Sequence, residues 1–484
     1  MARMLAQSNF WEITQVYCST FISNAYEITR LYFFSIEDSR RCLNTFTVSN
    51  YATLLCFHSC ILDSVGVVTF TKFLSKDMRI KSIKVDNFKS LVNFELPLAK
   101  FSCLVGLNGS GKSTVLQFFD FLSQQFRGDL DVWLKKRQWE ASDLNSKLTR
   151  KQNISYEILL THIDINFFDV PVDIKWSVSF NRQTLRCTAE RVEWNEFLLL
   201  KVEDGNYQIS TLDIQTKEVH DLEEGDKWNE SYQFRKGVFS GEITFDYQGS
   251  LLSQIKESQL PKELLELKKF FVNLHALDLL APELLRQRTR DAGYSLGLGG
   301  EKLSAFLHEI GEAKRVAIQA KLAKIYPRFR DIDILSLRSG WKNLTVQEQF
   351  GDTIVKTEAR HVADGFLRML AVFTQLSKAQ SFLLLDEIEN GINPEIIEFL
   401  VDELVESAPQ VLITTHSPMV LNYLEDDVAL AGVIYIYKAK NGATQAIRLF
   451  DIPSMREKLT VMGAGEVYED TLLTQLNEDI IGSL

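Results

Sequence analysis

Residues 106–113 read Gly-Leu-Asn-Gly-Ser-Gly-Lys-Ser, and this stretch decides the fold of the chain. It fits the pattern G-x-x-x-x-G-K-[ST], with the apolar run Phe101–Val105 before it and the helical period of residues 114–126 after it. A strand, glycine loop and helix in this order turn backbone N–H groups toward phosphate oxygens, and the helix dipole adds to their attraction. The sequence therefore predicts a nucleotide phosphate site made by Gly106, Asn108, Gly109, Ser110, Gly111, Lys112, Ser113 and Thr114.

Lys112 and Ser113 have separate expected roles within this loop. We expect Lys112 to reach the β- and γ-phosphates of ATP, and the Ser113 hydroxyl to ligate Mg²⁺.

A second apolar strand ends in two carboxylates. Residues 382–387 read Phe-Leu-Leu-Leu-Asp-Glu, which carries Asp386 and Glu387 to the end of a buried strand. Beside a phosphate loop, Asp386 would hold Mg²⁺, usually through water. Glu387 would act as the general base of ATP hydrolysis or orient the attacking water.

A histidine follows a third apolar strand. Residues 411–418 read Val-Leu-Ile-Thr-Thr-His-Ser-Pro, and His416 directly follows the strand-like part. A lone histidine is more often structural than catalytic. Its position after the acidic strand favours a catalytic role, in which it donates to the γ-phosphate and senses its loss.

The composition fits a globular protein from a reducing compartment. The 484 residues are 45% hydrophobic and 24% charged, and the net charge of −11 argues against a protein that coats nucleic acid. Six cysteines without metal-ligand spacing indicate reduced thiols, so we expect a cytoplasmic location. No signal peptide is evident. The apolar stretch 51–74 is interrupted by His58, Asp63 and Lys72, which disfavours a membrane span.

Changes in pattern divide the chain into four predicted parts. Residues 1–77 lack periodicity and motifs, and are either an extension upstream of a natural start at Met78 or a small accessory domain. Residues 78–250 carry the loop and a β-rich lobe, and residues 251–345 form a helical insertion. Residues 346–484 complete an α/β sheet with the acidic strand and His416.

Together these motifs resemble the ATP-binding-cassette ATPases of the SMC and RecF type. The resemblance includes residues 80–91, the loop, and Asp386-Glu-Ile-Glu-Asn-Gly-Ile-Asn-Pro394. It is closer to a compact subgroup, the bacterial AAA family ATPases of the OLD-like kind, and covers the chain from Met78 onward. It implies an α/β head with a β-rich lobe and an inserted helical lobe, but no long coiled coil. Many members of this subgroup work in anti-phage defence systems.

The family resemblance also implies an ATP-bound homo-oligomer, in which a signature loop of one subunit caps ATP on the other. The matching residues here are Ala363, Asp364 and Gly365, and Ala363 stands where the family usually has Ser. Backbone donors at the helix start remain, so the departure puts fast turnover in question rather than binding. Gln138 is a weak candidate for the glutamine-loop ligand of the metal, and an ordinary surface glutamine is the commoner explanation.

Two spacings narrow the predicted function. Lys112 and Asp386 are 274 residues apart, too far for a minimal transporter cassette and too close for a coiled-coil arm, and 68 residues follow His416, too few for a Toprim nuclease. We therefore expect an ATPase that controls a separate effector, for example a nuclease, in a defence system. A RecF-like DNA-repair ATPase is the alternative, and a transporter cassette ranks third.

Three basic clusters leave direct nucleic-acid binding open. They are Lys135 to Arg137, Arg286 with Arg288 and Arg290, and Lys314 to Arg330. They could line a DNA or RNA groove, although solvated helix faces are the commoner explanation.

Overall fold

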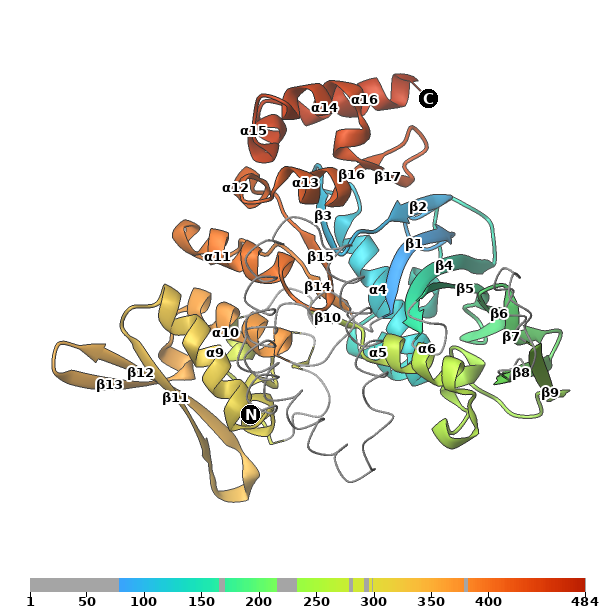
Figure 1. Cartoon of the computed structure of the whole chain (residues 1–484), viewed down its shortest axis with the longest axis horizontal. Coiled ribbons are helices and arrows are strands. Elements are labelled where there is room, and N and C mark those ends of the chain that lie inside the picture. The colour runs from blue at the N-terminus through green and yellow to red at the C-terminus, as the bar shows by residue number, and fades with distance from the viewer. Residues whose placement is uncertain are drawn as a thin grey trace, which may run out of the picture. The chain divides into compact units, whose positions relative to one another are not determined.

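The computed structural model describes residues 78–164, 170–215, 233–277, 282–290, 296–297, 299–377 and 382–483 (Figure 1). All of them belong to one compact unit, Ser75–Leu484. The prediction for residues 1–77 lies outside the described residues. Within the described ranges, no helix is long and apolar enough to cross a membrane.

A central six-stranded sheet carries the predicted motifs, in the order β10-β14-β15-β3-β16-β17. All its neighbouring strands run parallel except the β16–β17 pair. Its strands are β3 (Phe101–Val105), β10 (His275–Leu277), β14 (Phe382–Leu385), β15 (Gln410–Thr414), β16 (Val433–Lys438) and β17 (Thr444–Arg448). The fully buried pattern of β3, β14 and β15 follows from a parallel sheet that is covered on both faces.

Two antiparallel sheets complete the strands. The larger has the order β2-β1-β4-β5-β6-β7-β8-β9 and the smaller the order β11-β12-β13. The larger contains β1 (Arg79–Asp86), β2 (Phe94–Pro97), β4 (Asn153–Asp164), β5 (Val170–Asn181), β6 (Arg186–Trp194), β7 (Phe197–Glu203), β8 (Asn206–Gln215) and β9 (Gln233–Glu242). The smaller contains β11 (Phe329–Ser336), β12 (Lys342–Phe350) and β13 (Thr353–Glu358), so the predicted boundary after residue 345 falls inside β12.

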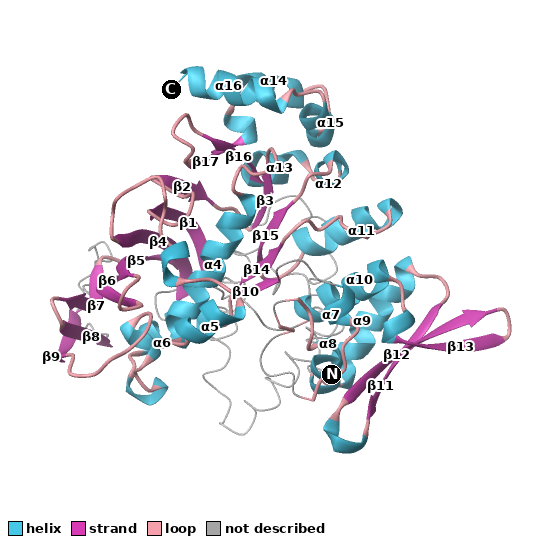
Figure 2. Ribbon diagram, turned by 180° about the vertical axis from the view of Figure 1, so that it is seen from behind, coloured by secondary structure: helices cyan, strands magenta, loops and turns pink. Residues whose placement is uncertain are grey.

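Helices pack on both faces of the central sheet and beside the antiparallel sheets (Figure 2). They are α4 (Lys112–Arg127), α5 (Leu130–Lys136), α6 (Lys262–Val272), α7 (Pro282–Leu285), α8 (Leu303–Glu309), α9 (Glu312–Ile325), α10 (Asp364–Leu376), α11 (Pro394–Val405), α12 (Pro418–Asn422), α13 (Asp426–Gly432), α14 (Pro453–Leu459), α15 (Ala464–Glu469) and α16 (Leu473–Ser483). The longest of these described helices has 16 residues, far short of a coiled-coil arm. The predicted α/β fold class is confirmed.

The core has two parts that meet at the central sheet. Along β3, Cys103 and Val105 belong to an apolar cluster with α10 and α11, whereas Leu104 belongs to a second cluster with α4 and the large sheet. The same alternation continues along β14, β15 and β16, because successive strand side chains point to opposite faces. The central sheet is therefore the shared wall of both cores, and the motifs sit at its edge.

A buried glutamine joins two of the sheets. The side-chain amide of Gln410, at the start of β15, accepts from the backbone N–H of Ile80 at 2.8 Å. It donates to the carbonyl oxygens of Ile80 and Ala99, both at 2.8 Å. This bonding fixes β1 of the large sheet to the central sheet.

A buried charge pair gives a test of the packing around α4. Asp120 is 4% exposed and accepts hydrogen bonds from Trp133 Nε1 at 2.7 Å and Arg137 Nε at 2.8 Å. We expect Asp120→Ala to lower the free energy of unfolding by about 3 kcal/mol, because it removes the buried carboxylate that accepts from both Trp133 and Arg137. Urea unfolding followed by circular dichroism measures this change. The exposed Asp246→Ala should change it by less than about 0.5 kcal/mol, and equal effects would contradict the interpretation.

Candidate functional site

The glycines of the loop are required by both conformation and packing. Gly106 has φ 142° and Gly111, which caps the start of α4, has φ 117°. A Cβ atom at Gly106 would lie 2.2 Å from the carbonyl oxygen of Ile436 in β16, and one at Gly111 would lie 2.3 Å from the Oγ1 of Thr444 in β17. The loop is therefore packed against the strands that follow β3 in the sheet, and only glycine fits at these two positions.

The Lys112 side chain folds back onto the phosphate loop. Its Nζ donates to the carbonyl oxygens of Gly106 at 2.9 Å and Leu107 at 3.2 Å, and the residue is 6% exposed. Burial lowers the pKa of Lys112, and the nearby Asp386, Glu387 and Glu389 act in the opposite direction. The Ser110 hydroxyl, also in the loop, is buried without a hydrogen-bond partner. An ammonium and an unused hydroxyl in one loop fit an anionic phosphate ligand.

The first two motifs meet across the sheet. Ser113 Oγ donates to Asp386 Oδ2 at 3.3 Å, although 273 positions separate the two residues. They come together because β15 lies between β3 and β14, so all three strands end at one edge. A hydroxyl and a carboxylate at this distance are oxygen ligands of the kind that Mg²⁺ takes beside a phosphate loop. Among the described residues, no group of three or more His, Cys, Asp or Glu side chains could hold a metal alone, and Mg²⁺ at phosphate sites relies largely on water and phosphate.

Thr414, at the end of β15, positions both carboxylate residues. Its hydroxyl donates to Asp386 Oδ1 and accepts from the backbone N–H of Glu387 at 2.8 Å. Glu387 has a left-handed backbone, with φ 46°, and its carboxylate accepts from the Asn390 side chain. The strained turn at Glu387 is thus held by a hydroxyl from the neighbouring strand.

His416 lies beside the same carboxylates. Its backbone N–H donates to Glu389 Oε1 at 2.8 Å. Burial, followed by the Lys112 charge, lowers the pKa of His416, while Glu387, Glu389 and Asp386 act in the opposite direction. These surroundings favour the neutral imidazole, which carries one N–H donor.

An open cavity of about 360 Å³ joins His416 to the loop. Its lining comes from the loop, from the start of α12 and from the last helices, and comprises Gly106, Leu107, Asn108, His416, Pro418, Tyr468, Glu469, Thr471 and Leu473. The backbone of Gly106 hydrogen-bonds Tyr468, whose pKa is raised chiefly by burial. The C-terminal helices therefore form one wall of the site.

The signature-like residues Ala363, Asp364 and Gly365 lie at the start of α10. Ala363 precedes α10, and a Cβ at Gly365 would lie 2.5 Å from the carbonyl oxygen of Gly391. Arg286 pairs with Asp364 and donates to the Val362 carbonyl oxygen at 2.9 Å. No hydrogen bond or ion pair among the described residues joins residues 363–365 to residues 106–114. The nucleotide role of Ala363, Asp364 and Gly365 therefore stays a prediction.

The metal-ligand role of Gln138 stays a prediction. It follows α5 with a left-handed backbone, φ 55°, and its N–H donates to the Lys135 carbonyl oxygen at 3.1 Å. In the part of the chain that the structure describes, no hydrogen bond connects Gln138 with Ser113 or Asp386.

Many side chains of the three basic clusters pair with other groups of the same chain. Arg137 bonds the buried Asp120, and Arg288 donates to Asn343 Oδ1 at 2.8 Å and pairs with Glu358 at 3.2 Å. Arg290 lies over the Trp341 ring at 5.0 Å, and Lys321 pairs with Glu403. These contacts disfavour the nucleic-acid groove that the clusters left open.

Four residues of the site were not singled out from the sequence. Thr414, Glu389 and Asn390 lie within the motifs, but a motif does not say which side chains bond one another. Arg368 lines a small cavity with Asp386 and Glu387, and its Nε is buried without a partner. Its place one turn into α10, close to the acidic strand, is decided by tertiary packing alone.

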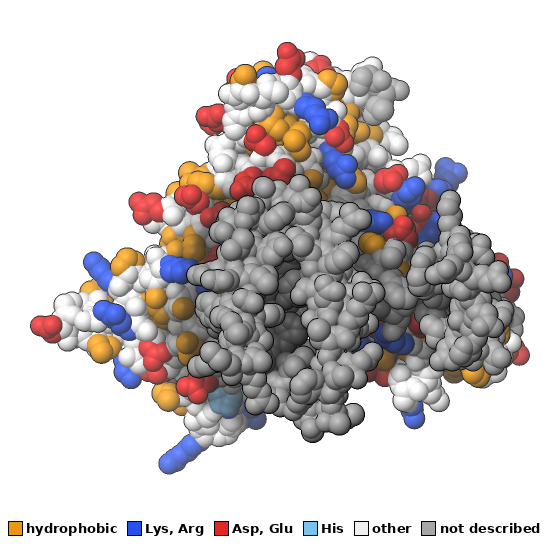
Figure 3. Space-filling view, viewed as in Figure 1, with side chains coloured by type: hydrophobic (Ala, Val, Ile, Leu, Met, Phe, Trp, Pro, Cys, Tyr) orange, Lys and Arg blue, Asp and Glu red, His pale blue; other side chains and the backbone are white. Residues whose placement is uncertain are grey.

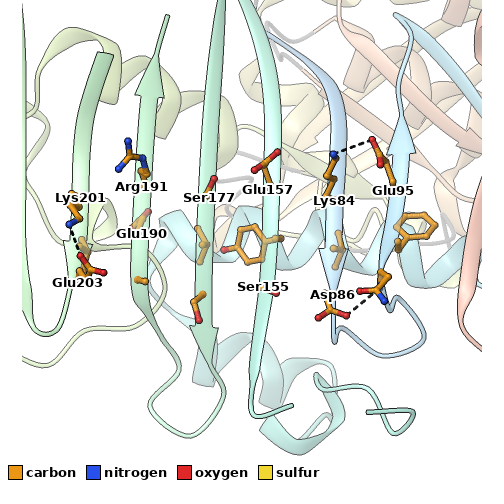
Figure 4. A pocket seen from close by; sticks show the side chains of 18 residues that line it. Lys84, Asp86, Glu95, Ser155, Glu157, Ser177, Glu190, Arg191, Lys201 and Glu203 are labelled. Atoms are coloured by element: carbon orange, nitrogen blue, oxygen red, sulfur yellow. Dashed lines mark hydrogen bonds and ion pairs between the residues drawn. The ribbon is translucent and has the colours of Figure 1, made fainter. Parts of the chain in front are cut away.

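A larger cavity, of about 780 Å³, lies away from the loop on the outer face of the eight-stranded sheet (Figure 4). Ser155 and Ser177 lie between charged side chains on both sides. Those charges are paired locally, for example Lys84 with Glu95 at 3.6 Å and Lys201 with Glu203 at 2.5 Å. It lacks the convergent, unpaired polar groups of the loop, so the loop is the better candidate site.

The Thr414 contacts generate a direct test. We expect Thr414→Val to lower kcat for ATP hydrolysis about tenfold or more, because both carboxylate residues lose the group that positions them. Phosphate release at saturating Mg-ATP measures this. Thr415→Val is the matched control, since Thr415 is equally buried but its hydroxyl accepts from Ser417 N instead. A normal kcat in Thr414→Val would contradict the positioning role.

Two family models match the chain. The model described as "AAA ATPase domain" matches residues 78–274, and the model described as "AAA domain, putative AbiEii toxin, Type IV TA system" matches residues 218–422. A curated relative, the energy-coupling factor transporter ATP-binding protein EcfA1 of Mycoplasma pneumoniae, is 24% identical over 188 residues. That match covers 38% of this chain and 59% of the relative.

Solved structures with a similar backbone fold include SMC heads. A SmcHead bound to the C-winged helix domain of ScpA aligns with a TM-score of 0.46 and 14% identity, over 78% of this chain and 99% of that one. The SMC head domain from Thermotoga maritima aligns with a TM-score of 0.37 and 11% identity, over 76% and 98%. The two family models thus match residues 78–274 and 218–422 to ATPase domains of the AAA family, and the strand–loop–helix and acidic-strand geometry fits an ATPase.

Proposed function

We propose that this chain is a cytoplasmic, ABC-type ATPase that binds ATP with Mg²⁺ at residues 106–114 and uses the cycle to regulate a separate effector of a bacterial defence system. One observation carries the catalytic part: Ser113 and Asp386 lie 3.3 Å apart, beside Lys112 and Glu387.

The residues of the site would share the reaction as follows. The loop N–H groups, Ser110 and Lys112 would hold the phosphates, and Ser113 and Asp386 would hold Mg²⁺. The metal ion, when bound, neutralises charge on the phosphate oxygens. Glu387 would accept a proton from the attacking water, and the neutral His416 would donate its N–H toward the γ-phosphate.

The signature-like residues would act across a dimer. Because Ala363, Asp364 and Gly365 make no hydrogen bond or ion pair with the loop of their own chain among the described residues, we assign them to the ATP of a second copy. The start of α10 offers backbone N–H donors there, but Ala363 offers no hydroxyl. We therefore expect slow turnover with intact binding.

The regulatory role has two supports. The resemblance to OLD-like ATPases of defence systems is one. The other is the family model for residues 218–422, whose description names a toxin of a type IV toxin–antitoxin system. The internal pairing of the basic clusters favours this role over direct DNA binding.

The first test uses Glu387→Gln. Removal of the general base should lower ATP hydrolysis about 100-fold or more and trap bound ATP. Light scattering should then show a larger assembly only when Mg-ATP is present. Lys112→Ala is the control, since it should lose nucleotide binding and show no shift. An unchanged mass in Glu387→Gln with bound ATP would overturn the sandwich while leaving ATP binding intact.

A second test separates regulation from DNA repair. Toxicity that needs both this chain and the product of a neighbouring gene, and that is lost in Glu387→Gln, would support the regulatory role. ATP hydrolysis stimulated about tenfold or more by DNA alone would instead support a RecF-like ATPase.

A further inference from the structure

Helix α10 carries a basic side chain, Arg368, in a part of the helix that is otherwise apolar. Its neighbours Leu367 and Met369 are fully buried, and the helix packs with β14 in one apolar core. Figure 3 shows lysine and arginine side chains standing out into solvent on the face that it draws. Arg368 is instead half-buried, and its Nε atom is fully buried. Burial of a cation costs free energy, so an arginine here needs a role that an apolar side chain could not fill.

The Arg368 guanidinium makes no hydrogen bond or ion pair with any residue that the structure describes. Burial lowers its pKa, and the negative charges of Asp364, Glu283 and Glu387 act in the opposite direction. Of these three carboxylates, Asp364 is paired with Arg286. Glu283 is exposed on α7, whereas Glu387 is half-buried like the arginine. Glu387 is therefore the acidic side chain whose surroundings match those of the guanidinium.

A small cavity joins Arg368 to Glu387. Its volume is about 20 Å³, close to the space of one water molecule, so the groups around it lie near one another. Its polar lining comes from Arg368, Asp386 and Glu387, and the rest is Val372, Leu385, Ile388, Ile392 and Leu400. Both oxygens of Asp386 already accept hydrogen bonds, from Ser113 and Thr414. Glu387 is therefore the better acceptor for the donors of Arg368.

The guanidinium also packs against the turn that follows Glu387. A Cβ atom at Gly391 would lie 3.5 Å from Arg368 Nε and 3.9 Å from its Cζ. Three residues earlier on α10, a Cβ at Gly365 would lie 2.5 Å from the carbonyl oxygen of Gly391. At the other end of the turn, the Asn390 side chain bonds the Glu387 carboxylate. Glu387 itself has φ 46°, a backbone conformation that persists only with support from its surroundings.

We propose that Arg368 is a positioning residue for Glu387. Its guanidinium holds the turn of residues 387–391 from the side of α10 and attracts the Glu387 carboxylate, so that the general base keeps one orientation. Thr414 holds the same turn from β15 through the Glu387 N–H. This inference rests on the proposed function, in which Glu387 is the base of ATP hydrolysis.

The first test compares the binding and hydrolysis of Mg-ATP by the full chain. Arg368→Gln should lower kcat about tenfold or more and change the ATP dissociation constant less than about twofold, because Arg368 acts on the base and not on the phosphates. Arg288→Gln is the matched control, since Arg288 bonds Asn343 and Glu358 instead, and it should behave as wild type. Circular dichroism and the melting temperature check that each variant is folded. A wild-type kcat in folded Arg368→Gln overturns the inference.

A double mutant separates positioning of the base from a general structural role. In the Glu387→Gln background, Arg368→Gln should lower the residual kcat less than about twofold, because the carboxylate that it positions is gone. An equal loss of kcat in the two backgrounds would show that Arg368 acts independently of Glu387, which overturns the inference.

Hydrogen exchange gives a readout without nucleotide. In the free chain, Arg368→Gln should raise the amide exchange rate of residues 387–392 about fivefold or more, because the turn loses its support from α10. Arg288→Gln should leave that rate unchanged, and an unchanged rate in Arg368→Gln contradicts the holding of the turn. A wild-type chain that hydrolyses no ATP counts against the proposed function, whereas the exchange rates still decide whether Arg368 holds the turn.

Discussion

The site depends on the insertion of β15 between β3 and β14. Parallel pairing of these strands places the phosphate loop and the acidic pair at one sheet edge, with Thr414 between them. The Thr414 hydroxyl then bonds Asp386 and the Glu387 N–H together. Without this central strand, Ser113 and Asp386 would not be brought within hydrogen-bonding distance. The chemistry proposed for the site therefore follows from sheet order as much as from the residues themselves.

The segment after His416 is part of the same construction. Strand β16 pairs with β3, and its Ile436 carbonyl leaves no space for a Cβ at Gly106. Thr444 of β17 packs closely against the loop at Gly111. Helix α15 adds Tyr468 beside Gly106. The C-terminal strands and helices therefore hold the loop in its conformation.

Two arginines hold the segment between the small sheet and α10. Arg286 holds the start of α10, and Arg288 holds the end of β13. These two arginines connect the edge strand to the signature-like residues by ion pairs and a backbone hydrogen bond. Such a connection ties the end of the small sheet to the start of α10.

The sequence by itself determined the phosphate loop, the acidic strand, the helix after the loop and the α/β class. These are local patterns, and glycine conformation, apolar periodicity and carboxylate position carry them without distant contacts. The helix expected at residues 114–126 is α4, and the strands expected at 101–105 and 411–415 are β3 and β15. Tertiary structure alone decided that Thr414 positions the carboxylates, that Tyr468 reaches Gly106, and that Arg286 and Arg288 serve internal pairs. Those contacts join segments far apart in the chain, and a single sequence contains no local signal for such distances.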